Sequence, residues 1–595
     1  MSLFLRSHDR FKNGKHHAYW SLVENKRCAG GKVVQRQVLY LGEINQAQRE
    51  AVLQAAQHFD PPVPAAPSLP GLAPAVADDE VAMAPPQIKL GEFSLHHPRQ
   101  WGACWVGTRL WEELKLDEFW RDRLPSSREG TNWRHVLQTL VTYRLLEPGS
   151  EWRLHRHWYV HSALGDLLGE DFSLAAKDQL YRCLDKLLPH RTALFQHLQR
   201  RWRDLFGAKF EVLLYDLTST YFESDPPFPE WDKRRFGYSR DKRSDCVQVV
   251  IALIVTPDGF PLAYEVMPGN TSDKTTLKTF LKLIRKRYGK AERTWVMDRG
   301  IPTEAVLEIM RKPRHRIAYL VGTPKGRLTK LETQLLNLPW HLARPAVEVK
   351  LLSQGQELFV VVRSQDRRHK ERAMRRGRLK KLWRRLHELQ AQARLDRDEL
   401  MLKVGQEKQK AGRAFGLVEM KFPEVGQPVN AQTFTFRLRK DKLREVLRRE
   451  GRYLLRTNLT GTDPAELWRY YLQLTEIEGV FKNLKDDLRL RPIFHQNQSR
   501  IEAHIFVAFM AYCLQVTLKG HLRRIAPGLT PRAVLEQFAT LQLLDVHFPM
   551  TDGRTLVFSR YTQPEKAHRI LLTRLGWALP EQSPPRISAQ RQLED

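Results

Sequence analysis

Two short apolar segments that each end in an aspartate constrain the fold more than any other feature of the sequence. EVLLYD ends at Asp216, and RTWVMD ends at Asp298. Unbroken apolar runs of this length are typical of strands that are buried on both faces of a sheet. A carboxylate beside a buried strand is costly unless it is paired or bound to a cation, although either aspartate alone is equally well explained as a turn residue or helix cap. Together the two segments predict a covered sheet with acidic groups at its strand ends.

The sequence around these two segments predicts an α/β fold. VQVVIALIV and PLAYEVM are expected to form a hairpin, because Asp258 and Gly259 between them are a strong turn signal. Helices are expected from Leu277 to Ile284 and from Pro302 to Met310, and RIAYLVG is expected as a further strand. The order strand, strand, strand, helix, strand, helix, strand indicates a mixed sheet flanked by helices.

A third acidic residue, Glu478, lies in a predicted helix near the C-terminal end of the chain. Asp463 is a suitable N-cap for this helix, and Pro464 suits its first position. A narrow apolar stripe along it would pack on a core and leave the carboxylate at the border of the stripe. The stripe consists of Ile477, Phe481, Leu484 and Leu488.

Lysines are expected to share the helix face of Glu478. On an ideal helix, Glu478, Lys482 and Lys485 lie within about 60° of one another, with Tyr471 and Leu474 on the same side.

The three acidic residues predict a site for hard divalent cations. Asp216, Asp298 and Glu478 offer only oxygen ligands, which suit Mg²⁺ or Mn²⁺. Two such ions, roughly 4 Å apart, can activate a water or a 3′-hydroxyl and stabilise the leaving oxygen of a phosphodiester. The five cysteines form no CxxC pair and are interpreted as small buried hydrophobic residues. His504, in an apolar helix, is interpreted as a packed histidine rather than a ligand.

The charge of the chain predicts a large anionic partner. The 595 residues include 97 Lys and Arg against 67 Asp and Glu, which gives a net charge of +30. Nucleic acid is the first candidate and a membrane surface the second. The longest apolar run, Val247–Val255, is too short to span a bilayer, which takes roughly 20 residues. No secretory signal is recognised at the N-terminus, so we expect a cytoplasmic protein without a membrane partner.

Composition and periodicity divide the chain into seven segments. A small basic module of strands and a short helix, which either grips DNA or is only a structural cap, is followed by a Pro/Ala-rich linker. Next comes an all-α, Trp-rich domain, which is expected to bind DNA although its aromatic residues are expected mainly in the core. The sheet domain comes in two parts, which are separated by a β-rich insertion with a long basic helix that either is solvated or contacts DNA. An accessory region and tail end the chain. The expected boundaries are 1–58, 59–96, 97–205, 206–325, 326–451, 452–525 and 526–595.

Long stretches of the sequence resemble a known family. LLYDLTSTYFE, the segment from GYSRDKRSDC to NTSDKTTL, VMDRGIPTEAVL, and EIEGVFKNLKDDLRLRPIFHQNQSRIEAHIFVAFMAYCL are similar to DDE transposases of the insertion-sequence-four group, in its sixteen-thirty-four branch. The resemblance implies a ribonuclease-H-like fold that is interrupted by a β-rich insertion before its glutamate. It also implies that Asp216, Asp298 and Glu478 are the catalytic triad and the ligands of two metal ions.

The motif of this group around the glutamate is only partly present. Tyr471, Glu478 and Lys485 occupy the expected positions, whereas Leu474 stands where the group has an arginine. The resemblance implies that Tyr471 and Lys485 bind DNA phosphates, and Lys482 is a further candidate contact. Because Leu474 replaces the arginine, the resemblance does not imply the phosphate contact that the arginine makes. It also does not imply the hairpin pathway that some members of the group follow.

The expected function is therefore transposition of an insertion sequence. The resemblance implies that the protein binds the terminal inverted repeats as double-stranded DNA, cleaves there, and joins the 3′-OH ends to target DNA, as a homodimer or a larger assembly. One alternative is a transposase-derived protein that binds DNA without cleavage, which the presence of all three acids disfavours. Another is a stand-alone nuclease, which would hardly need such large flanking domains.

Overall fold

The chain divides into two compact units. We describe a computed structural model in which the first unit comprises Met1–Lys209, Leu217–Thr271 and Glu478–Asp595, and the second comprises Phe210–Asp216 and Ser272–Ile477. The structure describes residues 3–12, 15–27, 33–43, 46, 49, 86–223, 226, 228–239, 241, 243–288, 293–298, 302–312, 317–323, 338–344, 346–392, 395–460, 463–491, 493–526, 528–582 and 586–588.

The N-terminal module is a three-stranded antiparallel sheet. Its strands are β1 (Leu3–Lys12), β2 (Lys15–Arg27) and β3 (Val33–Glu43), in the order β1-β2-β3. The predicted strands correspond to β2 and β3, and the structure adds β1, whose charged residues obscure its pattern. The predicted turn at Gly30 and Gly31 and most of the following helix lie outside the described residues.

The next part of the first unit is helical, as predicted. Seven of the eight tryptophans in this part are buried, and Trp152, at 43% exposure, is the exception. Their burial confirms that aromatic residues here mainly build a core. The principal helices are α2 (Gly102–Glu113), α3 (Leu116–Arg121), α4 (Trp133–Leu146), α5 (Glu151–Arg153), α7 (Leu164–Leu168), α8 (Lys177–Leu184) and α9 (Arg191–Phe206).

The C-terminal region forms a second small sheet with a strand from the predicted linker. The sheet has the order β18-β17-β16-β4, in which β4 (Ser94–Gln100) pairs with β16 (Gln542–Pro549). The remaining strands are β17 (Thr555–Tyr561) and β18 (Arg586–Ser588). The guanidinium of Arg99 donates two hydrogen bonds of 3.1 Å to Asp545, and both residues are buried. The last residues of the segment expected as a linker are therefore part of the folded unit.

The second unit is built on a large mixed sheet. Its strand order is β10-β11-β12-β15-β9-β8-β5. Strands β5, β8 and β9 are parallel, and the other pairs are antiparallel. The strands are β5 (Val212–Phe222), β8 (Thr294–Met297), β9 (Ala318–Thr323), β10 (His341–Arg344), β11 (Val347–Gln354), β12 (Glu357–Ser364) and β15 (Arg452–Thr457).

Strand β5 belongs to both units. In the first unit, the sheet order continues from β5 to β6 (Val247–Val255) and β7 (Pro261–Pro268), which pair antiparallel around the predicted turn. Two helices of the second unit, α10 (Asp273–Tyr288) and α11 (Glu304–Arg311), fall where they were expected. The predicted order of strands and helices, and thus a mixed α/β fold, is confirmed.

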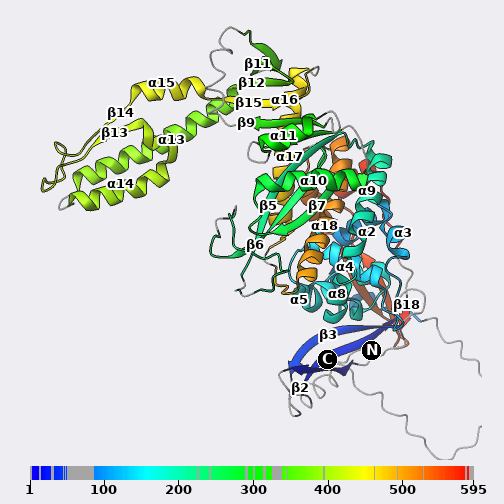
Figure 1. The fold of residues 1–595 in the computed structure, drawn as a ribbon. Helices are drawn as coiled ribbons and strands as arrows, with labels where there is room; N and C mark the ends of the chain where they lie inside the picture. Colours follow the sequence, from blue (N-terminus) through cyan, green and yellow to red (C-terminus); the bar gives the residue numbers. More distant parts are fainter. Residues whose placement is uncertain are drawn as a thin grey trace, which may run out of the picture. The chain divides into compact units, whose positions relative to one another are not determined.

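The segment expected as a β-rich insertion combines strands with long helices. After β10, β11 and β12, which join the large sheet, the chain forms α13 (Gln365–Ala391) and α14 (Arg397–Ala411), which lie side by side in Figure 1. These helices share an apolar core with the hairpin of β13 (Val418–Lys421) and β14 (Thr435–Leu438), in which Leu386 and Phe434 are fully buried. A basic helix, α15 (Lys440–Arg449), follows and has no buried residue.

A long apolar helix, α18 (Gln498–Ile525), lies in the core of the first unit. It packs against α2, α4, α8 and α9. Among the described helices it alone is long and apolar enough to cross a membrane, but 94% of its apolar stretch is buried inside the protein. Such burial is typical of a core helix, as the sequence predicted.

Candidate active site

The strand register brings Asp216 and Asp298 to matching positions on neighbouring strands. Strands β5 and β8 are parallel, and Tyr215 is paired with Met297. Asp216 and Asp298 are the next residues along the two strands. Neighbouring strands lie about 5 Å apart, and residues in register on parallel strands point to the same face of the sheet. The strand pairing therefore supports a position of these two aspartates close together on adjacent strands. Strand β5 continues past Asp216 to Phe222, so Asp216 does not end its strand as the sequence predicted.

Both aspartates follow buried residues but are themselves accessible. Asp216 is half-buried and Asp298 is exposed. Tyr215, the residue before Asp216, fastens β5 to α10. Its hydroxyl donates a 2.8 Å hydrogen bond to Thr276, and its ring packs against Phe280. The packing fixes the backbone of β5, while the carboxylate of Asp298 is open to solvent and that of Asp216 is half-buried.

Glu478 lies in the first unit, on α17 (Leu474–Lys482). Its side chain is exposed. The predicted apolar stripe is confirmed, since all four of its members are at most 7% exposed: Ile477, Phe481, Leu484 and Leu488. The helix is thus anchored by one side and presents its glutamate on another. The convergence of Glu478 with the two aspartates stays a prediction.

The helix that carries Glu478 is shorter than the sequence indicated. The predicted cap is confirmed, since Asp463 accepts a hydrogen bond from the backbone N–H of Ala465 at the start of α16 (Pro464–Leu472). The chain then breaks at Gln473, and after α17 it continues as a π-helical turn, η6 (Asn483–Asp487). Because both irregularities change the rotation per residue, the projection of 100° per residue does not hold from Tyr471 to Lys485.

Tyr471 packs within the second unit. It is half-buried, and its ring lies against Trp468 and Tyr453. A Cβ atom on Gly322 of β9 would lie only 2.6 Å from the Tyr471 hydroxyl, so this close approach requires glycine. The packing gives Tyr471 a structural role beside its predicted contact with DNA.

Lys485 forms ion pairs that the sequence did not reveal. Its Nζ lies 2.9 Å from Oδ1 of Asp241, and Nη1 of Arg491 lies 2.7 Å from Oδ2 of the same carboxylate. The side chains of Lys485 and Asp241 are each 12% exposed. Lys482 is exposed and pairs with no described residue. Asp241 stands in the segment GYSRDKRSDC, but a partner 244 residues away leaves no pattern that periodicity can detect.

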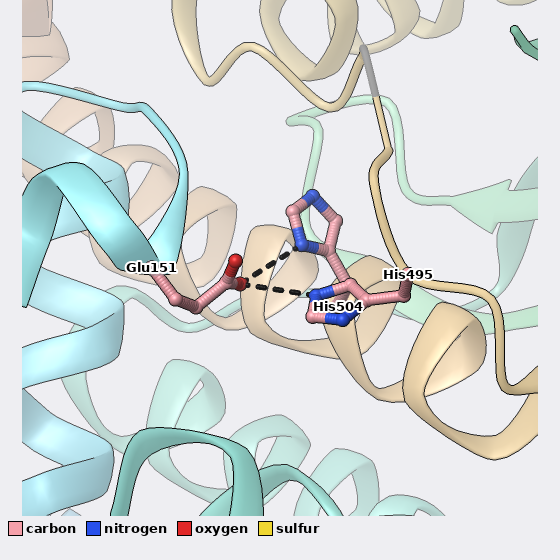
Figure 2. A group of neighbouring side chains, drawn as sticks. All are labelled: Glu151, His495 and His504. Carbon is pink, nitrogen blue, oxygen red and sulfur yellow. Dashed lines mark hydrogen bonds and ion pairs between the residues drawn. The ribbon is translucent and has the colours of Figure 1, made fainter. Parts of the chain in front are cut away.

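A cluster of two histidines and a glutamate is buried elsewhere in the first unit. Nε2 of His495 and Nδ1 of His504 each lie 3.2 Å from the same oxygen, Oε1, of Glu151 (Figure 2). Among the described residues, this is the one group of three or more His, Cys, Asp or Glu side chains whose ligand atoms all lie within 4.8 Å of one another. His504 is buried, which is consistent with its interpretation as a packed histidine.

The electrostatics of this cluster favour a hydrogen-bonded network around an ionised Glu151. Burial alone would raise the pKa of Glu151, but the hydrogen bonds to His495 and His504 outweigh burial and hold this pKa well below its usual range. Burial and the nearby Arg144 lower the pKa of His504 to about 4, so its imidazole is neutral at pH 7. A guanidinium nitrogen of Arg144 lies 4.0 Å from Glu151 and balances its charge.

The donor set of this cluster differs from that of the predicted metal site. Two imidazoles and one carboxylate would suit Zn²⁺, whereas Mg²⁺ and Mn²⁺ prefer oxygen ligands of the kind that Asp216 and Asp298 provide. The carboxylate of Glu151 is already paired with two hydrogen-bond partners and a buried cation. We therefore assign a structural role to the cluster, which ties α5 to the start of α18.

Comparisons with known proteins find two transposase family models and a solved transposase structure. A protein-family model described as the transposase DDE domain matches residues 207–514, a range that includes all three predicted catalytic acids. A second model, described as the N-terminal domain of IS1634 family transposases, matches residues 5–61. A solved structure, the cryo-EM synaptic complex of the piggyBac transposase with hairpin DNA, aligns with a TM-score of 0.32 and 8% identity over 74% of this chain and 76% of that chain. No curated protein matches the chain.

Proposed function

The chain belongs to the IS1634 family of DDE transposases, and from this premise we propose that it moves an insertion sequence. It binds the terminal inverted repeats of its element, cleaves the phosphodiester bonds there, and transfers the 3′-OH ends to target DNA. The net charge of +30 suits a protein that holds two segments of a polyanion.

The parallel pairing of β5 with β8 is the observation that carries the proposal. It supports Asp216 and Asp298 as a pair of oxygen ligands on adjacent strands, in a ribonuclease-H-like arrangement of strands. We propose that Glu478, exposed on α17, completes the set when the protein binds DNA. The three carboxylates together would hold two Mg²⁺ or Mn²⁺ ions. Once bound, these ions supply activation of the attacking oxygen and stabilisation of the leaving oxygen.

Residues around Glu478 position the DNA backbone. Lys482, exposed one helical turn beyond Glu478, contacts a phosphate near the cleaved bond. Lys485, which pairs with Asp241, also contacts a DNA phosphate. Tyr471 contacts a phosphate as well, while its ring stays packed in the second unit. Because a synaptic complex joins two ends, we propose at least a homodimer on DNA, at the nucleoid in the bacterial cytoplasm.

A cleavage assay tests this function. Purified protein with Mg²⁺ or Mn²⁺ is incubated with DNA that carries the inverted repeats flanking its gene. We expect nicking at the repeat ends, and we expect Asp298→Ala to abolish nicking while binding is kept. Glu308→Ala, which removes another exposed acid of the second unit, is the matched control and should nick like the wild type. Equal nicking by the wild type and Asp298→Ala would rule out the proposed site, and binding without any nicking would indicate a DNA-binding protein that does not cleave.

A further inference from the structure

The connection between β5 and β6 exposes three large aromatic side chains. Trp231 is 67% exposed, Phe236 53% and Tyr238 88%. Large aromatic side chains in water are costly, and their exposure on a folded protein marks binding surfaces. We call these three residues the aromatic loop residues.

The backbone that carries these residues is held firmly. Arg234 and Asp232 form a buried ion pair of 2.7 Å. The guanidinium of Arg234 also donates hydrogen bonds to the side-chain and backbone oxygens of Gln496, and it lies 3.9 Å from the ring centre of Phe228. The exposure of the aromatic side chains is therefore a property of an anchored loop.

The backbone between Phe236 and Tyr238 is particularly constrained. A Cβ atom on Gly237 would lie 2.2 Å from the carbonyl oxygen of Gly269, so the two chain segments touch there. The amide of Gln248 donates hydrogen bonds to the carbonyl oxygens of Tyr238 and Gly269. These contacts fix the direction in which the loop presents its rings.

The same loop is fastened to the segment that follows Glu478. Asp241 pairs with Lys485 and with Arg491, all within the first unit. Lys485 follows Glu478 by seven residues, which corresponds to roughly 10 Å along a helix. The aromatic loop residues thus belong to a connection tied close to the proposed catalytic glutamate.

The described cations of the loop are already occupied by protein groups. Lys233 pairs with Glu502 at 2.6 Å, and Arg243 pairs with Asp245 and Glu223. The guanidinium of Arg235 donates hydrogen bonds to backbone carbonyl oxygens of the loop. Among the described side chains of this loop, the rings are therefore the groups left to contact a DNA ligand, while the positive charge of the whole chain attracts its phosphates.

We propose that Trp231, Phe236 and Tyr238 form a stacking surface for unpaired bases at the DNA end being cleaved. The inference rests on the proposed function and adds the kind of DNA structure that the protein recognises. Aromatic rings stack on any base because every base has a π-face, so the surface tolerates different sequences. It favours an opened DNA end over a fully paired one.

Binding in the absence of cleavage tests the proposal. Affinity is measured with Ca²⁺ in place of Mg²⁺, for duplex repeat ends that are fully paired and for ends with several unpaired bases at the cleavage site. We expect the full-length wild type to prefer the unpaired end. Each of Trp231→Ala, Phe236→Ala and Tyr238→Ala should lose about tenfold of the affinity for that end, and the triple variant should lose the preference altogether.

Three controls separate stacking from other effects. Tyr238→Phe keeps a ring and should keep the preference. Phe93→Ala, at a position with the same 53% exposure in another part of the first unit, should bind like the wild type. The salt dependence of binding should be unchanged in the triple variant, because no phosphate contact is removed.

Two results would overturn the proposal. One is a triple variant that binds DNA and retains the preference for unpaired ends. The other is a triple variant that loses only self-association, which would show that the surface binds a second copy of the chain. A wild type that binds no repeat end would instead refute the proposed function itself. Nicking by a triple variant with unchanged base preference would refute the stacking surface alone.

Discussion

The two groups of acidic residues in this protein differ in what surrounds them. Glu151 is 6% exposed and is held by two histidines and a buried arginine. Asp298 and Glu478 are exposed, and neither forms an ion pair with any residue that the structure describes. Burial of a charge requires partners within the protein, whereas an accessible carboxylate can take its partner from solution. The comparison favours a role in stability for the buried cluster and is consistent with the proposed metal chemistry of the exposed acids.

The largest expected difference is in catalysis. Glu478→Gln should slow nicking of repeat ends more than about 10²-fold, because an amide is a poor ligand for Mg²⁺ and one electrostatic contribution to the transition state is lost. The melting temperature of the Glu478→Gln variant should equal that of the wild type, since the Glu478 side chain is exposed. Nicking rates and thermal unfolding measure both quantities. A Glu478→Gln variant that cleaves at the wild-type rate would remove Glu478 from the site.

The second difference is in stability. Glu151→Ala should lower the free energy of unfolding by about 3 kcal/mol, because it leaves Arg144 buried without its carboxylate partner. Urea unfolding of the full-length wild type and variant measures this change in the free energy of unfolding. Glu147→Ala, which breaks an exposed ion pair with Arg153 only a few residues away, is the control and should cost less than about 1 kcal/mol. Equal costs for both variants would contradict the structural role of the cluster.

The same cluster predicts acid sensitivity. The pKa of His504 is lowered by burial to about 4 in the folded protein, from the ordinary value of 6.5. Between these two pH values the unfolded chain binds the proton and the folded chain does not, so stability falls as the pH drops from 6.5 towards 4. The low pKa of Glu151 has the same sign below pH 4.5.

Thermal unfolding between pH 7.5 and 4.5 checks this dependence. The slope attributable to His504 is at most about 1.4 kcal/mol per pH unit. His504→Gln should flatten the curve over this range, since its amide does not titrate. If wild type and variant lose stability in parallel, then other groups cause the acid sensitivity.

The smallest expected effect concerns the ion pair of Lys485 with Asp241. Lys485 and Asp241 are mostly buried but retain some exposure. We therefore expect this ion pair to contribute less to stability than the buried cluster and more than the exposed acids. A double-mutant cycle with Lys485→Met and Asp241→Asn should give a coupling energy of about 1 kcal/mol. A coupling near zero would indicate that Lys485 is free to bind DNA and would strengthen its predicted role as a phosphate contact.

Local patterns predicted the two strands, but only Asp298 follows the end of its strand, whereas β5 continues past Asp216 to Phe222. The apolar runs before Asp216 and Asp298 were sufficient to place buried strands, and the order of elements then implied a mixed sheet. Strand β1 was missed because charged residues interrupt LFLRSHDRFK. The break at Gln473 was missed because neither glycine nor proline marks it.

Long-range pairings could not be predicted from one sequence. Glu151 meets His495 and His504 across more than 340 residues, and Lys485 meets Asp241 across 244. Such contacts depend on tertiary packing, which hydrophobic periodicity does not encode. The candidate site was therefore predicted through strand ends, helix faces and family resemblance, whereas the partners of its lysine and the buried cluster became visible only in the structure.

Binding of Mn²⁺ tests the central claim most directly. Electron paramagnetic resonance can count the Mn²⁺ ions bound by the full-length protein on a repeat end, for the wild type and for Asp216→Asn, Asp298→Asn, Glu478→Gln and Glu151→Gln. We predict that each of the first three variants binds Mn²⁺ more weakly than the wild type, and that folded Glu151→Gln binds it equally well. The account would be contradicted if the Asp216, Asp298 and Glu478 variants bound Mn²⁺ as tightly as the wild type. It would also be contradicted if Mn²⁺ binding were lost only in Glu151→Gln.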